Sequence, residues 1–297
     1  MATLDSQLHA TTQVHCSGKS HSSYWWIHKF IPKIISYCIL SIALLAVIFP
    51  LVWVFLTSIK PRTLAYRIPP AWSFTPTLEN YAALLNKYPF PHHFLNSIIV
   101  ASSTTILGLI LGSLAAYSFA RFNTGGNFLQ GWVFNNRTMP PIAVAIPIFL
   151  LANALGLIDT YIGLIAAYLS FSLPFIIWML IGFFEEVPRE MEEAAMVDGA
   201  TRLQVLRHIT IPLTAPGIAA TGILNFLFAW NEFLFALLLT GNNTRTLPIT
   251  IANFLTKRGV EIGELCAATT VVIIPVMLLA FSIRGYLVKG LSYGGIK

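Results

Sequence analysis

Residues 185–217 read EEVPREMEEAAMVDGATRLQVLRHITIPLTAPG and separate two long apolar runs. This stretch predicts two helices joined by a tight turn. Pro188 suits the first turn of the first helix, and the glutamates after it lie where the positive end of a helix dipole favours carboxylates. Gly199 is a natural stop for this helix. Thr201 and Gln204 have the spacing of a capping box, so a second helix is expected to start at once.

The second helix of this loop is predicted to be amphipathic. Its apolar stripe consists of three residues: Leu203, Leu206 and Ile209. Pro212 is predicted to end the helix, because proline lacks the backbone N–H that a helix interior needs. In the first helix, Ala194 and Ala195 provide a small-residue face that another protein's surface can approach closely. A flexible linker would not need so many capping, turn and apolar-stripe residues, so we expect the loop to keep one shape in water.

Apolar runs long enough to cross a lipid bilayer dominate the rest of the chain. Of its 297 residues 56% are hydrophobic and 10% are charged, whereas about a quarter are charged in a typical soluble domain. At about 20 residues per crossing, six spans are predicted, at about 34–58, 96–120, 128–157, 159–185, 217–240 and 265–288. Only helices satisfy their own backbone hydrogen bonds in lipid at this length. The predicted fold is therefore an all-α membrane protein with six transmembrane helices.

The spans define the predicted organisation of the chain. Residues 1–30 are expected to form a disordered tail, whose loosely spaced histidines (His9, His15 and His21) do not favour a metal site. Residues 31–297 form the transmembrane domain, with an outer loop at 60–93 and the two-helix loop at 185–216. The outer loop is rich in proline and is predicted to be stiff, with a short helix capped by Thr77. It is either a docking surface for a partner or a cap over the bundle.

Several function classes are excluded by composition and motifs. The net charge of +6 is scattered between apolar runs and forms no basic patch, so we expect no nucleic-acid binding. The three cysteines lie far apart and form no CxxC pair, so neither a metal site nor a disulfide is expected. No phosphate-binding loop with glycines followed by lysine and serine or threonine is present. The chain is therefore not expected to hydrolyse ATP or to act as an enzyme.

The two-helix loop resembles the signature of permease subunits of bacterial ATP-binding-cassette importers. That signature reads E-A-A, three residues, G, nine residues, I, one residue, L-P. The matching residues here are Glu193, Ala194, Ala195, Gly199, Ile209 and Pro212. Ile211 stands where the signature usually has leucine, a same-size apolar exchange. Six positions agree over twenty residues, and the loop lies between two spans as it does in that family.

Three further segments are similar to the maltose-type permeases of carbohydrate importers: NSIIVASSTTILGLILGSLAAYSFARF at 96–122, GLIDTYIGLIAAY at 156–168 and FAWNEFLFALLLT at 228–240. The likeness is to the shorter, six-span partner of such importers and covers roughly residues 30–297. It implies a permease subunit that forms half of the translocation pathway for a sugar. It also implies the bacterial inner membrane as the location, with both termini in the cytosol, and a weak excess of lysine and arginine on that side agrees.

The resemblance also implies partners and contact residues. Partners are a second, homologous permease chain, two cytosolic ATPase subunits that bind ATP and Mg²⁺, and an extracytoplasmic substrate-binding protein; this chain itself would hold no cofactor. The first helix of the loop, called the coupling helix in the family, would seat in a cleft of the ATPase. The contact would be made by Glu193, Ala194, Ala195, Asp198 and Gly199, with Ile209 and Pro212 fixing the next helix.

Two ionisable residues lie at predicted membrane depth, where such groups usually face protein or a water-filled path. Glu232, with its neighbours Trp230 and Asn231, is expected to line the path or to brace a kinked fifth span. Arg137 is expected to have a structural role, because the pair Pro140 and Pro141 frees backbone carbonyls nearby. A direct pair between Arg137 and Glu232 is the alternative, although their predicted depths differ by about 9 Å at the rise of a helix.

Two other functions compete with this interpretation. Permeases for amino acids, phosphate and metals share the loop signature, so the sugar prediction depends on the other three segments. A secondary transporter or channel would have the same hydropathy but would not need the two-helix loop.

Overall fold

The structure is a computed structural model that describes residues 22–256 and 259–293. It divides into two compact units, Met1–Trp53 and Val54–Lys297. Most of the helix α1 (Ser22–Ser58) belongs to the first unit, and its stretch Ile35–Ser58 is long and apolar enough to cross a membrane. Residues 22–30 lie in α1 and not in a tail, whereas residues 1–21, with the three tail histidines, lie outside the described part.

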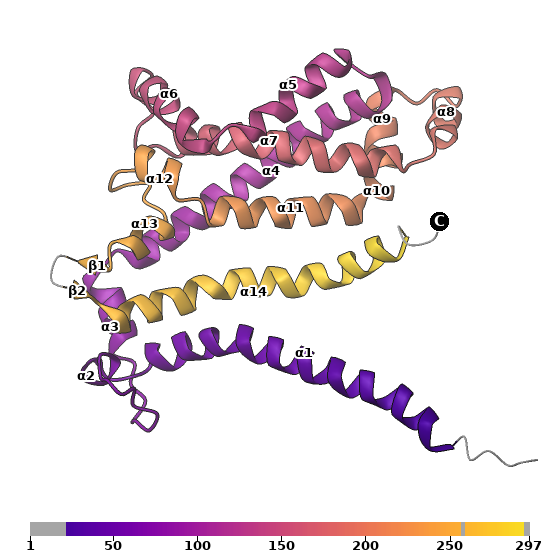
Figure 1. The fold of residues 1–297 in the computed structure, drawn as a ribbon. Coiled ribbons are helices and arrows are strands. Elements are labelled where there is room, and N and C mark those ends of the chain that lie inside the picture. The colour runs from indigo at the N-terminus through magenta and orange to yellow at the C-terminus, as the bar shows by residue number, and fades with distance from the viewer. Residues whose placement is uncertain (1–21, 257–258, 294–297) are drawn as a thin grey trace, which may run out of the picture. The chain divides into compact units, whose positions relative to one another are not determined.

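Long helices run side by side in the second unit and form its bundle (Figure 1). They are α4 (Phe90–Phe122), α7 (Tyr161–Glu185), α11 (Ala215–Trp230) and α14 (Ile262–Tyr293). At one end of the bundle, called the α8 end below, lie α8 (Arg189–Val197) and α9 (Arg202–Val205). At the other, called the α3 end, lie α3 (Glu79–Lys87), α13 (Leu247–Ala252) and the antiparallel strands β1 (Leu255–Thr256) and β2 (Gly259–Val260).

Small residues allow α4 and α7 to approach closely. A β-carbon on Gly108 or Gly112 of α4 would lie 2.6 or 2.5 Å from the Ile176 side chain of α7, so any larger residue there would force this side chain to move. Such small-residue contacts are typical of helix pairs in membranes, where close backbone approach increases van der Waals contact. A polar contact joins α4 to α11, because the Asn225 amide donates to the Thr105 hydroxyl at 3.2 Å.

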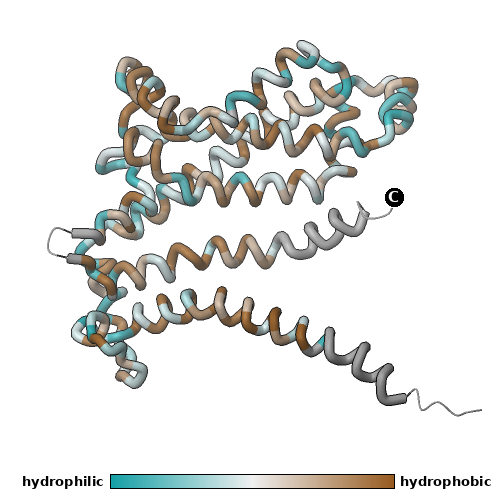
Figure 2. Tube along the Cα trace, in the orientation of Figure 1, coloured by the Kyte–Doolittle hydropathy of each residue, from teal (hydrophilic) through white to brown (hydrophobic). Residues whose placement is uncertain are grey.

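The predicted spans are confirmed in outline, and two of them are interrupted. Among the described residues, four helices are long and apolar enough to cross a membrane, and up to six spans result if each of two bent pairs counts as one. Figure 2 shows the corresponding hydropathy, with hydrophobic residues along α14 and hydrophilic ones around α8.

The third predicted span is two helices with a sharp bend at the proline pair. Helix α5 (Gly126–Thr138) and helix α6 (Pro141–Ala154) meet at 90°. Met139 is extended because a residue before proline avoids the helical region, and Pro141 then starts α6. Arg137 lies in α5, but its side chain lies outside the described part of the chain.

The fifth span is also interrupted. Helix α11 ends at Trp230, and after three non-helical residues the short helix α12 (Leu234–Leu239) begins. The predicted run from 217 to 240 is therefore two helices with a break, which agrees with the kink that was expected there.

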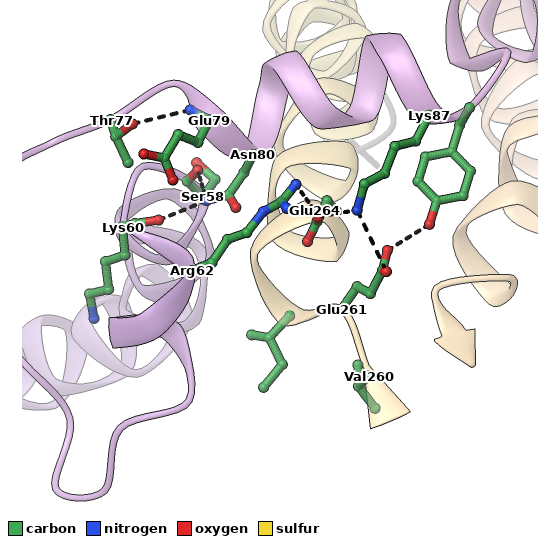
Figure 3. A network of polar contacts seen from close by, with 12 residues as sticks. Ser58, Lys60, Arg62, Thr77, Glu79, Asn80, Lys87, Val260, Glu261 and Glu264 are labelled. Atoms are coloured by element: carbon green, nitrogen blue, oxygen red, sulfur yellow. Dashed lines mark hydrogen bonds and ion pairs between the residues drawn. The ribbon is translucent and has the colours of Figure 1, made fainter. Parts of the chain in front are cut away.

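The outer loop is folded against the start of α14, as Figure 3 shows. The buried Glu264 carboxylate pairs with Arg62 of α2 (Arg62–Ala65) at 2.6 Å and with Lys87 at 3.3 Å. The Tyr88 hydroxyl donates to Glu261 at 2.6 Å, and burial, together with this bond, raises the pKa of Tyr88 to about 12. These contacts fit the interpretation of the outer loop as a cap over the bundle.

The short helix predicted in this loop is confirmed as α3. The Thr77 hydroxyl accepts a hydrogen bond from the Glu79 backbone N–H at 3.2 Å, but the N-cap position of α3 is Leu78, so Thr77 lies one residue before the cap that was predicted for it. The Asn80 amide then donates to the carbonyls of Ser58 and Lys60, at 2.9 and 2.8 Å, and so holds the helix on the end of α1 that belongs to the second unit.

Candidate functional site

The two-helix loop between α7 and α11 has the predicted turn at Gly199. The N–H of Gly199 donates to the Met196 carbonyl at 3.1 Å, and the N–H of Ala200 donates to the Ala195 carbonyl at 3.0 Å. This is the Schellman pattern, which requires a left-handed residue after the helix. Gly199 supplies it with φ of 90°, and a β-carbon there would meet no atom within 4 Å. Glycine is therefore needed for its backbone conformation and not for space.

The second helix starts with the predicted capping box and then differs from the prediction. Gln204 accepts from the Thr201 N–H at 2.7 Å, and the Thr201 hydroxyl accepts from the Gln204 N–H at 3.4 Å. Helix α9 continues through a π-helical turn, η1 (Leu206–Thr210), into α10 (Ile211–Leu213). The helix then ends at Leu213, one residue after Pro212, and an 81° bend separates it from α11, so the end predicted at Pro212 is confirmed to within one residue. The π turn widens the helix just before Pro212, which makes room for its ring against the preceding carbonyl.

The apolar stripe of this helix faces the bundle only in part. Leu206 is buried in the core with α4 and α7, and Ile209 is half-buried. Leu203 is 64% exposed, so it lies outside the packed part of the stripe.

A buried ion pair holds α8 on the end of α4. Arg121 donates from Nε and Nη2 to the two carboxylate oxygens of Glu192, at 2.9 and 3.0 Å. The hydroxyls of Thr210 and Tyr117 donate to the same carboxylate at 2.7 and 3.3 Å. Arg121 also donates to the Val187 carbonyl at 2.8 Å. Because every charge has hydrogen-bond partners, the cost of burying the pair is offset, and removing one partner would leave a buried charge alone.

Because the Glu192 side chain is buried against the bundle, its neighbours lie on the outer side of α8. Exposed residues are Glu193, Ala194, Asp198 and Gly199, and Ala195 is half-buried. The exposed set also includes Val197, 88% accessible, and the partly accessible Met191 and Met196. We call Glu193, Ala194, Val197 and Asp198 the α8 face. Its apolar members, exposed on a water-facing helix, suit contact with another protein. Sequence reasoning missed both Glu192 and Val197, because no local spacing says which side of α8 packs on the bundle.

Residues 230–232 occupy the break between α11 and α12. Trp230 is buried at 2% exposure and stacks on Phe226, with ring centroids 5.7 Å apart, whereas Asn231 is exposed. The Glu232 carboxylate accepts from the backbone N–H groups of Phe235 and Ala236, at 3.0 and 3.1 Å. Glu232 therefore bonds to the first turn of α12, directly after the break.

A second polar cluster lies at the α3 end, around Asp159. Its carboxylate accepts from the backbone N–H groups of Gly241, Asn243 and Thr244, at 2.8, 3.1 and 2.9 Å, and from the Thr244 hydroxyl at 2.8 Å. Burial raises the pKa of Asp159, but these hydrogen bonds outweigh burial and lower it to about 2. Asp159 thus holds the segment after α12 against the turn before α7.

No metal centre is formed within residues 22–256 and 259–293, where no three His, Cys, Asp or Glu side chains gather suitably. The site that stands out is therefore the two-helix loop with its exposed α8 face.

Comparisons with known proteins identify this architecture. Residues 108–293 match the family described as binding-protein-dependent transport system inner membrane component. The chain is 34% identical over 286 residues to the trehalose transport system permease protein SugB of Mycobacterium tuberculosis, covering 94% of this chain and 99% of that protein. It is 35% identical over 266 residues to the trehalose/maltose transport system permease protein MalG of Thermococcus litoralis, covering 87% and 95%.

A solved structure shows the same fold. A chain of a bacterial ABC transporter that imports the acidic polysaccharide alginate superposes with a TM-score of 0.70, covering 86% of this chain and 96% of that one, at 22% identity. The resemblance found in the two-helix loop is thereby confirmed over nearly the whole chain. The protein belongs to the family of inner membrane components of binding-protein-dependent transport systems, the permease subunits of ATP-binding-cassette importers.

Proposed function

We propose that this chain forms half of the translocation pathway of an ATP-driven sugar importer and couples that pathway to a cytosolic ATPase. The observation that carries the proposal is the α8 face, an exposed surface on a helix whose opposite side is fixed by the buried Arg121–Glu192 pair. A rigid surface is what a helix needs to transmit movement between subunits. A surface helix without a partner would not need a buried ion pair beneath it.

The α8 face has the composition of a docking surface. Val197 is almost fully exposed, and burying such a side chain in a partner's cleft stabilises a complex by about 1.5–3 kcal/mol. Ala194 permits close approach of the partner's backbone, while Glu193 and Asp198 offer charges that orient the complex. ATP and Mg²⁺ would be bound by the partner, because this chain contains no phosphate-binding loop.

The remaining subunits follow from this role. The chain would pair with a second, homologous permease chain, contact one of the two ATPase subunits of the complex at the α8 end, and receive its substrate at the α3 end from an extracytoplasmic binding protein. The α8 end would then face the cytosol, with both chain termini on the same side of the bacterial inner membrane. Trp230, Asn231 and Glu232 would lie along the path between the two permease chains, with Asn231 as the exposed member.

The sugar substrate is supported by the names of the relatives, which describe trehalose and maltose transport. The test is uptake of labelled trehalose by vesicles that contain the whole importer with its binding protein. We expect unlabelled maltose or trehalose to compete with the label and unlabelled methionine to have no effect. If methionine competes and the sugars do not, the chain serves an importer for another class of solute.

A further inference from the structure

The last turns of helix α4 contact both helices of the two-helix loop. Arg121 binds Glu192 of α8, and the same carboxylate accepts from Thr210 of η1. The Arg202 guanidinium of α9 lies over the Phe122 ring, 4.4 Å from its centroid, in a cation–π contact. Both helices of the loop are therefore attached to the last two turns of α4, in addition to their covalent links to α7 and α11.

The other end of α4 is bonded to the segment that follows α12. Side chains of its first turns contact residues 243–250 through four residues: His92, His93, Asn96 and Ser97. Asn96 is fully buried, and its amide donates to the carbonyls of Asn243 and Arg245, both at 2.9 Å. Asp159 holds the same segment from the side of α7. Segment 241–252 is thus fixed to the start of α4 at the α3 end of the bundle.

Between these two attachments α4 is an uninterrupted helix. Its only proline, Pro91, lies in the first turn, and its 33 residues span about 50 Å at 1.5 Å per residue. The covalent routes are less direct: α7 contains Pro174, and α11 ends at Trp230, before the segment is reached. Proline, chain breaks and Gly/Ser pairs are places where helices bend, and α4 stays helical through its one such pair, Gly112–Ser113, so a displacement at the α8 end has its most direct route through α4.

We propose that α4 is the rigid element that carries the movement of the two-helix loop to segment 241–252, with Arg121 and Asn96 as the positioning residues at its two ends. This inference rests on the proposed function and adds the route by which ATP-driven movement at the α8 face reaches the opposite end of the bundle. Such a route needs a stiff element that is bonded at both ends, and α4 is bonded to the two-helix loop at one end and to segment 241–252 at the other.

The test measures movement of the segment directly. Spin labels are placed at the exposed positions Asn242 and Ser73, in a chain whose own cysteines are replaced by serine, within the complete importer. In the wild-type chain we expect the distance between the labels to change when ATP and vanadate are added. In Arg121→Gln we expect this change to be lost, and uptake per ATP hydrolysed to fall about tenfold, which is a typical coupling between two sites.

Arg62→Gln is the matched control, because it also removes an arginine from a buried glutamate but leaves α4 untouched. We expect it to keep the distance change and the uptake per ATP hydrolysed. Arg121→Lys keeps the charge but not the two-oxygen contact, so its uptake should lie between those of wild type and Arg121→Gln.

Asn96→Ala removes hydrogen bonds between α4 and segment 241–252, so it should abolish the same distance change while ATP hydrolysis continues. If the Arg121→Gln chain fails to assemble into the importer, the Asn96→Ala variant tests the inference in its place. The inference is overturned if an assembled Arg121→Gln or Asn96→Ala importer retains the full change. A wild-type importer that shows no ATP-driven uptake would instead refute the proposed function, so the two failures are distinguishable.

Discussion

Replacing Glu193 by lysine, or Gly199 by aspartate, is expected to reduce ATP-driven uptake at least about tenfold while the chain stays folded in the membrane. Glu193→Lys reverses a charge on the exposed α8 face. Gly199→Asp forces a β-carbon onto a residue with φ of 90°, a strain of about 1–3 kcal/mol that loosens the turn after α8. Both changes alter the docking surface and leave the bundle contacts of Glu192 in place. Uptake and ATP hydrolysis are measured together in vesicles.

Two matched variants distinguish a loss of docking at the α8 face from a general loss of folding. Glu193→Gln keeps the shape of the side chain without reversing the charge, so its loss of uptake should be smaller than that of Glu193→Lys. Gly182→Ala is the control for Gly199, because Gly182 lies inside α7 and a β-carbon there meets no atom within 4 Å. We expect Gly182→Ala to transport normally, since alanine favours a helix more than glycine does. Near-normal uptake in both Glu193→Lys and Gly199→Asp would refute the docking role of the α8 face.

Replacing Asp159 by asparagine is expected to release segment 241–244 from the turn before α7. Three backbone N–H groups and one hydroxyl lose a charged acceptor, and hydrogen bonds to charged groups contribute about 1.5–3 kcal/mol each. The amide N–H groups of Gly241 and Thr244 should exchange with deuterium faster, while those of α7 should not change. Gly241→Ala should have a similar local effect, because its β-carbon would lie 2.6 Å from the Asp159 carboxylate. Unchanged exchange in both variants would show that the segment does not depend on Asp159.

The pH dependence of this contact has a definite sign. The pKa of Asp159 falls from 3.8 to about 2 in the folded chain, so the folded state favours the charged carboxylate. The stabilisation is therefore complete above about pH 4 and is lost as the pH falls through 2. We expect the difference in exchange between wild type and Asp159→Asn to be constant from neutral pH to about pH 4, to shrink between about pH 4 and 2, and to disappear below about pH 2. A loss of the difference near pH 6 would contradict this assignment.

The features that sequence predicted are those whose hydrogen bonds close within a few residues. The capping box of Thr201, the turn at Gly199 and the short helix after Thr77 are of this kind, since each depends on spacing alone. The exceptions are the break before Pro141, where the extended Met139 interrupts the third span, and the π turn at Leu206–Thr210, which no local pattern indicated.

The features that sequence missed depend on partners far along the chain. Arg121 and Glu192, or Asp159 and Thr244, meet only once α4, α7 and the segment after α12 have packed. A glutamate beside the family signature gives no sign of facing inward, and an aspartate in a turn gives no sign of which loop it binds. The orientation of α8, and with it the identity of the α8 face, follows from the bundle and not from local pattern.

Accumulation of labelled trehalose in vesicles that hold this chain, its companion subunits and the binding protein tests the coupling of uptake to ATP most directly. We predict that accumulation needs ATP and the ATPase subunits, persists when proton and sodium gradients are dissipated, and disappears with Gly199→Asp. Accumulation by this chain without the ATPase subunits, driven by a proton or sodium gradient, would contradict the proposed function and identify a secondary transporter.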